Sequence, residues 1–86
     1  MNYRLSWHAE EQLERRQIPN EWLDMLLDGA EQRFRPSADT EILQSRFAAD
    51  DGRMYLLRAV MAIDKEPPVV VTVYRTSKIE KYWRPE

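Results

Sequence analysis

The spacing of apolar residues changes from a helical period to a strand period about one third of the way along this chain. Ala9 and Leu13 lie one helical turn apart, which predicts a helix over residues 6–16 with a narrow apolar stripe. Residues 20–28 carry a wider apolar arc and predict a second amphipathic helix, which ends at Gly29 in a left-handed conformation. The N-terminal third is therefore expected to be helical.

Short segments with the two-residue period of β-strands fill the rest of the chain. The predicted strands cover residues 31–35, 41–48, 53–63 and 69–74, and Pro36 is expected to end the first of them. A final helical turn follows the last strand. This order predicts a single α+β domain over residues 1–86, in which two N-terminal helices pack on one face of a three- to four-stranded antiparallel sheet and a short C-terminal helical tail follows.

The chain is mildly acidic overall, but its charges are unevenly distributed. A net charge of −2 with 43% apolar and 33% charged residues indicates a globular protein and argues against a strongly basic nucleic-acid-binding protein. Acidic side chains dominate residues 8–31, whereas cations prevail from Arg75 onward, so a local basic patch is compatible with the total. The chain has no cysteine and no apolar run near the ~18 residues of a membrane span, and we expect a soluble cytoplasmic protein without membrane contact.

The C-terminal segment interleaves cations with aromatic rings. Such a segment suits the phosphates and bases of a nucleic acid. It equally suits a clamp that packs its rings on the core and keeps its cations in water. We expect RNA-binding roles for four of its residues, namely Arg75, Lys78, Lys81 and Tyr82.

Two motifs frame most of the chain. Ser6-Trp7-His8-Ala9 is followed by Arg16-Gln17-Ile18, and Val71-Thr72-Val73-Tyr74 forms the last predicted strand. In this order they resemble the family called domain of unknown function 4258. The resemblance implies a fold similar to the RelE-like toxins, within a broad set of small metal-independent ribonucleases, and it implies an antitoxin as a candidate partner. RelE-like enzymes cleave RNA with basic residues and often with a tyrosine near the C-terminus.

Metal-free RNA cleavage requires a base for the 2′-hydroxyl, a cation for the phosphorane and an acid for the leaving oxygen. Histidine is the side chain whose ordinary pKa lies nearest neutrality, and His8 is the single one in the chain. Arg46 and Arg58 lie on adjacent predicted strands and are expected to project from the sheet face without helices, as a fork for phosphate. Tyr74 has a strand position from which it could join them. The predicted catalytic residues are therefore Arg58, Arg46, His8 and Tyr74.

Each of these residues also has a purely structural interpretation. A histidine at a helix start more often bonds locally or packs on the sheet, and Arg58 could pair with a carboxylate such as Glu41. One histidine and no cysteine exclude the usual tetrahedral zinc site, and the chain lacks a glycine-rich phosphate loop, so we expect no metal and no cofactor. The second hypothesis is a non-catalytic module that binds a protein partner or forms a homodimer.

Overall fold

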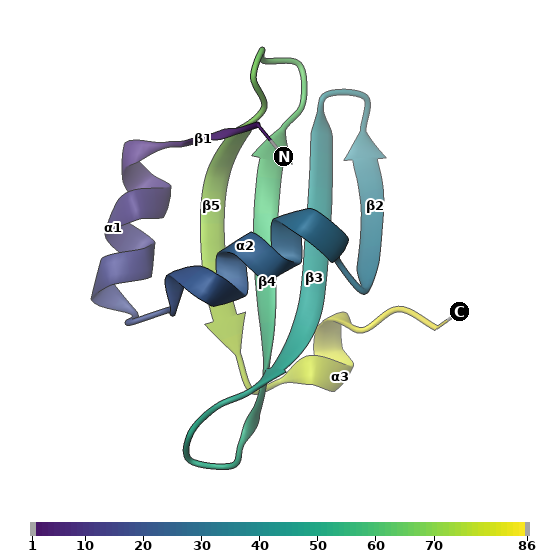
Figure 1. The fold of residues 1–86 in the computed structure, drawn as a ribbon. Coiled ribbons are helices and arrows are strands. Elements are labelled where there is room, and N and C mark those ends of the chain that lie inside the picture. Colours follow the sequence, from purple (N-terminus) through teal and green to yellow (C-terminus); the bar gives the residue numbers. More distant parts are fainter. Residues whose placement is uncertain (1, 86) are drawn as a thin grey trace.

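The computed structural model describes residues 2–85, which form a β-sheet with helices on both of its sides (Figure 1). In chain order the elements are β1 (Arg4–Leu5), α1 (Trp7–Arg15), α2 (Asn20–Gly29), β2 (Gln32–Ser37), β3 (Thr40–Ala48), β4 (Met54–Ala62), β5 (Val69–Thr76) and α3 (Ile79–Tyr82). Both predicted helices and all four predicted strands are present, and the α+β class is confirmed. No helix in this part of the chain is long and apolar enough to cross a lipid bilayer.

The sheet has five strands in the order β1-β5-β4-β3-β2. Strands β2 to β5 form the predicted antiparallel meander, but β1 pairs with β5 in parallel, so the sheet is mixed. The Arg4 N–H bonds to the Pro68 carbonyl at 2.9 Å, and the Ser6 N–H bonds to the Val70 carbonyl at 3.0 Å. A strand of two residues is too short to show a period, which is why the expected strand count was too low.

The prediction that Pro36 ends the first strand of the meander is wrong. β2 continues through Pro36 to Ser37, with a register shift between Phe34 and Ser37. A proline is tolerated there because β2 lies at the edge of the sheet, where a missing N–H removes no bond to a further strand. The proline and the shift also make this edge a poor template for pairing with another chain.

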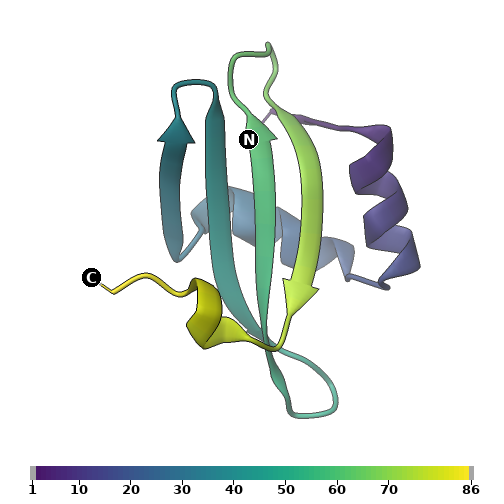
Figure 2. The same cartoon turned by 180° about the vertical axis from the view of Figure 1, so that it is seen from behind.

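The two N-terminal helices and the C-terminal residues lie on different sides of the sheet (Figures 1 and 2). α2 crosses one face, α1 runs beside β5, and α3 lies on the other face, which we call the open face. The main core fills the space between the helices and the sheet, and Leu26, Leu43 and Leu57 are among its fully buried side chains. Each buried leucine contributes about 2–3 kcal/mol of hydrophobic stabilisation.

The N-terminus of α1 is tied to the last strand. The Ser6 hydroxyl accepts a hydrogen bond from the Ala9 N–H at 3.0 Å, as an N-cap does, and it donates one to the Val71 carbonyl at 2.8 Å. The same side chain therefore begins the helix and fixes its position against β5.

The C-terminus of α1 places a non-glycine residue in a left-handed conformation. The Ile18 N–H bonds to the Leu13 carbonyl at 3.0 Å across Gln17, whose φ is +51°. In this type of helix C-terminus, the residue with the left-handed conformation is usually glycine. Gly29, by contrast, has no positive φ, so its predicted left-handed conformation is wrong. Ala30 follows it in an extended conformation that leads directly into β2.

Replacing Gln17 with glycine is expected to raise the free energy of unfolding by about 0.5–1 kcal/mol. The left-handed conformation strains a residue with a Cβ by more than the entropy that glycine loses on folding. Urea denaturation of the two proteins measures the difference. Arg16→Gly is the matched control, because Arg16 has a φ of −91°, and this variant should be no more stable than the wild type. A Gln17→Gly protein less stable than the wild type would contradict the explanation.

Candidate functional site

Four polar side chains, one from each strand of the meander, form a row across the sheet: Gln32, Gln44, Arg58 and Tyr74. Each is the register partner of the next along the row. The neighbouring row, with Leu43, Ala59 and Val73, is buried in the core beneath the helices. Because successive residues of a strand point to opposite faces, the four polar side chains lie on the open face. We call them the polar row.

Short hydrogen bonds connect the polar row from end to end. Gln44 Nε2 donates to Gln32 Oε1 at 2.7 Å, and Gln44 Oε1 accepts a bond from Arg58 Nε at 2.9 Å. Arg58 Nη1 donates to the Tyr74 hydroxyl at 2.6 Å. Gln44 is 0% exposed, and no buried side-chain nitrogen or oxygen in the described residues lacks a partner. A network that is satisfied in this way holds its members in one arrangement.

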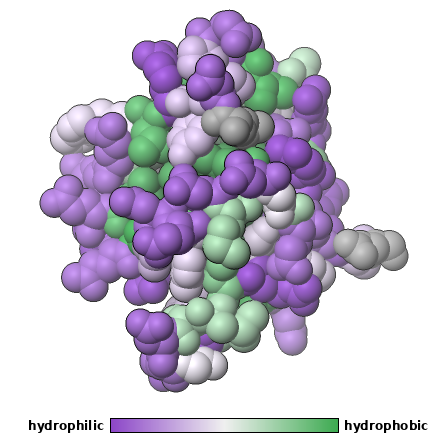
Figure 3. Space-filling model, viewed as in Figure 1, coloured by the Kyte–Doolittle hydropathy of each residue, from purple (hydrophilic) through white to green (hydrophobic). Residues whose placement is uncertain are grey.

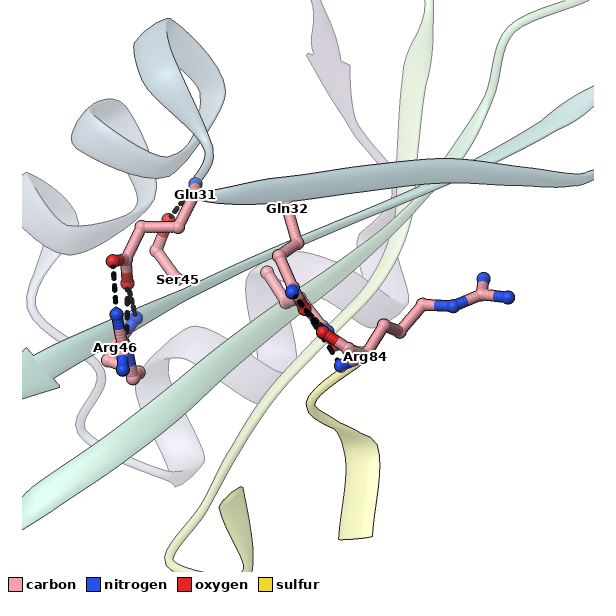
Figure 4. Close-up of polar contacts among 6 residues, drawn as sticks. Glu31, Gln32, Ser45, Arg46 and Arg84 are labelled. Atoms are coloured by element: carbon pink, nitrogen blue, oxygen red, sulfur yellow. Dashed lines mark hydrogen bonds and ion pairs between the residues drawn. The ribbon is translucent and has the colours of Figure 1, made fainter. Parts of the chain in front are cut away.

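The C-terminal tail, residues 79–85, lies against the polar row and is bound through its backbone. Gln44 Nε2 donates to the Tyr82 carbonyl at 3.0 Å. Gln32 Nε2 donates to the Arg84 carbonyl at 2.7 Å, and Gln32 Oε1 accepts the Arg84 N–H at 3.1 Å (Figure 4). The two glutamines, which we call the amide pair, thus fix the path of the tail by contacts with main-chain atoms.

Arg58 is a half-buried cation that forms no ion pair with a carboxylate of the described residues. Its guanidinium lies 4.2 Å from the centroid of the Tyr82 ring and 5.8 Å from that of Tyr74. The interpretation in which Glu41 pairs with Arg58 is wrong, because Glu41 binds two arginines of β2 at 3.3 and 3.4 Å. A cation surrounded by neutral groups and ring faces keeps its attraction for an anion.

Arg46 lies on β3 two residues beyond Gln44, but its charge is already compensated. Glu31 accepts hydrogen bonds from Arg46 Nη2 at 2.8 Å, from Arg46 Nε at 3.2 Å and from the Arg46 backbone N–H at 2.7 Å (Figure 4). The guanidinium also lies 4.1 Å from the centroid of the Trp83 ring. With its guanidinium bound by Glu31, Arg46 does not form the predicted phosphate fork with Arg58.

The same contacts make the stability contributed by Glu31 dependent on pH. The side-chain hydrogen bonds from Arg46, followed by the backbone bond, hold the pKa of Glu31 below its ordinary value of 4.5. Since the folded-state pKa is the lower one, the contribution is present above the unfolded-state pKa and is lost as the pH falls through the folded-state pKa.

Glu31→Gln is expected to lower the free energy of unfolding at neutral pH by about 1 kcal/mol, a small value because this side chain is 39% exposed. The difference from the wild type should shrink as the pH falls from about 5 toward about 2. Urea denaturation of both proteins across this range measures it. A difference that stays constant down to the lowest pH would show that the carboxylate charge is not responsible.

His8 lies apart from the polar row. It is an exposed residue in the first turn of α1, and no hydrogen bond or ion pair joins its side chain to another described residue. Ser6 anchors this end of α1 to Val70 and Val71, whereas Tyr74 lies three residues further along β5, or roughly 10 Å. The predicted catalytic set is therefore divided, with Arg58 and Tyr74 in contact and His8 apart.

No three His, Cys, Asp or Glu side chains of the described residues are grouped to hold a metal ion.

The predicted RNA-binding residues are divided as well. Arg75 follows Tyr74 on β5 and therefore points to the opposite face, where it lies 5.0 Å from the centroid of the Tyr55 ring and lines a hollow of about 440 Å³. Lys78 immediately precedes α3 and Lys81 lies within it, and both line a different hollow of about 480 Å³. Lys81 Nζ lies 5.4 Å from the Tyr82 ring centroid, so Lys81 and Tyr82 share the open face with Arg58.

The family described as domain of unknown function (DUF4258) matches residues 5–75 of the chain. The chain belongs to this family. The region that matches DUF4258 contains all four residues of the polar row, and it ends before Tyr82 and the rest of the tail. The DUF4258 assignment confirms the family inferred from the two end motifs. No curated protein and no solved structure gives a significant match to the chain.

Proposed function

We propose that this DUF4258 protein engages RNA through the open face, as a RelE-like, metal-independent ribonuclease of the toxin type. The observation that carries the proposal is Arg58, a half-buried guanidinium without a carboxylate partner in the described residues, set between the Tyr74 hydroxyl and the Tyr82 ring. Guanidinium groups bind phosphate through paired N–H donors, and aromatic rings next to them can stack on bases.

The contacts of Arg58 support a role for it in phosphate binding. Its Nε and Nη1 atoms are engaged by Gln44 and Tyr74, so the remaining N–H groups are available for phosphate oxygens. As the pentavalent phosphorane gains charge, the fixed guanidinium stabilises it without having to reorganise. The Tyr74 hydroxyl accepts its bond from Arg58, so its own O–H is not used in that bond and can donate to the leaving 5′-oxygen.

The 2′-hydroxyl proton passes to hydroxide from solvent, because the polar row contains no carboxylate or imidazole to receive it. The cleavage rate is therefore expected to rise with pH in the neutral range. Lys78, which precedes the tail, and Lys81 within it extend the positive charge toward this end of the sheet and guide the RNA strand toward Arg58.

Labelled single-stranded RNA tests the proposal directly. The purified protein should bind it with an affinity that falls steeply as salt is raised, and it should cleave it in the presence of a chelator to products with a 2′,3′-cyclic phosphate. An all-deoxy strand of the same sequence should bind and stay intact, because it lacks the nucleophile. Absence of binding at low salt would refute the proposal. Binding of RNA without cleavage would confine the role of this face to RNA recognition.

A further inference from the structure

Trp7 is the aromatic residue of the described part of the chain that has no ring, cation or hydrogen-bond partner within it. Its side chain is 76% exposed, because Trp7 lies on the side of α1 away from the buried residues Ala9 and Leu13. Cations of the chain itself cover five other rings, those of Phe34, Tyr55, Tyr74, Tyr82 and Trp83. Trp22 stacks on Phe47 at 5.0 Å, and the Tyr3 hydroxyl donates to Asp24. Among the described aromatic rings, the indole of Trp7 is therefore the one whose faces are available to a side chain of another molecule.

The surroundings of Trp7 are strongly acidic. Three glutamates follow it at the spacings i+3, i+4 and i+7, so all four side chains line one outward side of α1. This side, which we call the Trp7 face, borders a hollow of about 570 Å³ lined by Trp7, Glu10, Glu11, Glu14 and Arg15. Figure 3 shows that the outer side of the molecule over α1 is hydrophilic, at the left of the view.

The charge of the Trp7 face is only partly compensated. Glu11 forms an ion pair with Arg15 at 3.7 Å, whereas Glu10 and Glu14 have no ion pair with another described residue. Three carboxylates and one exposed guanidinium leave this face with a net negative charge. Such a face repels the phosphates of a nucleic acid and attracts cationic groups.

We propose that the Trp7 face is the docking surface for a basic helical segment of a partner protein. Lysine or arginine is the side chain that both parts of the face recognise, since its cation is attracted to the indole ring and to the carboxylates. Cations one turn apart on a partner helix are separated by about 5–6 Å, which is also the separation of Glu10 and Glu14 along α1. Tryptophan is among the residue types that contribute most to the binding energy of protein interfaces.

Two synthetic helical peptides of 18 residues test the proposal. One carries lysines at i and i+4 beside a leucine stripe, and the other carries glutamates at the lysine positions. Isothermal titration calorimetry with the full chain at low salt should show binding of the basic peptide only. Tryptophan emission should change on binding, and the change should be absent in Trp7→Phe, because Trp22 and Trp83 are packed within the fold.

Surface variants locate the binding. Trp7→Ala, and separately the double variant Glu10→Gln and Glu14→Gln, should each weaken binding of the basic peptide about tenfold or more. Glu21→Gln combined with Glu66→Gln removes the same charge elsewhere and should change the affinity less than about twofold. Thermal unfolding confirms that each variant is folded.

Any of four results would overturn the proposal. The basic peptide could fail to bind, Trp7→Ala could bind it as well as the wild type, or the control double variant could lose as much affinity as the double variant on α1. The face could also bind RNA in place of the basic peptide, with that binding lost in Trp7→Ala. This result would assign the face to a nucleic acid and would equally overturn the proposal. None of these results depends on RNA cleavage, because the Trp7 face and the polar row belong to different elements.

Discussion

Arg58→Ala is expected to lower the affinity for single-stranded RNA by about 10- to 100-fold. A charge-assisted hydrogen bond to phosphate contributes about 1.5–3 kcal/mol, and each 1.4 kcal/mol corresponds to a factor of about ten. Cleavage should fall further, by about 100- to 1,000-fold, because the guanidinium stabilises charge that develops only in the phosphorane. Fluorescence anisotropy and gel analysis of labelled RNA measure the two effects, at a temperature where both proteins are folded.

Two further variants separate the role of Arg58 in RNA binding from its role in the fold. Arg58→Lys keeps the charge but loses the planar fork, so it should retain part of the binding and little of the cleavage. Arg16→Ala removes one cation from the end of α1, away from the polar row, and should change the affinity less than about threefold. If Arg58→Ala and Arg16→Ala lower RNA affinity equally, the binding is a non-specific effect of net charge and Arg58 has no special position in it.

Gln44→Leu is expected to lower the free energy of unfolding by about 2–4 kcal/mol and to release the C-terminal tail. Leucine fills a similar volume, but it leaves Arg58 Nε and the Tyr82 carbonyl without their partners, and it takes one bond from Gln32. Each polar group left unpaired in a buried site costs about 1–3 kcal/mol. Urea denaturation measures the stability, and trypsin cleavage after Lys78 or Lys81 measures the release of the tail.

Gln12→Leu is the matched control for this variant. Gln12 is a half-buried glutamine of α1 whose side chain forms no hydrogen bond with another described residue. The same chemical change there should alter the stability by less than about 0.5 kcal/mol. If Gln44→Leu is as stable as the wild type and its tail resists trypsin equally well, the amide pair does not hold the tail.

The two-residue period of the strands was enough to place Arg58 and Tyr74 on one face. Arg58 lies between the apolar residues Leu57 and Ala59, and the turn at Gly52 fixed which residues of β3 and β4 face each other. The same period also places Arg75 on the opposite face from Tyr74, although the run of cations in the sequence associated it with the tail. Alternation along a strand was therefore a better guide to the site than closeness in sequence.

The pairing of charges could not be predicted from the pattern. Glu31 binds Arg46 because β2 begins beside β3, and Glu41 binds the arginines of β2 rather than Arg58. The amide pair was missed because an isolated glutamine in a strand carries no signal of its own, although Gln44 lies directly opposite Arg58 in the hairpin register. His8 was selected for its chemistry alone, and the anchoring of α1 at the start of β5 separates it from Tyr74.

Anchorage of the tail by main-chain atoms has a consequence for how this surface can evolve. The amide pair recognises the Tyr82 carbonyl and both backbone groups of residue 84, and any amino acid except proline supplies the same groups there. Side chains at positions 84 and 85 can therefore diversify while the segment keeps its course. Natural variation or directed randomisation of these two positions would alter the hollow that they line with Gln32 and Phe34, at little cost to folding.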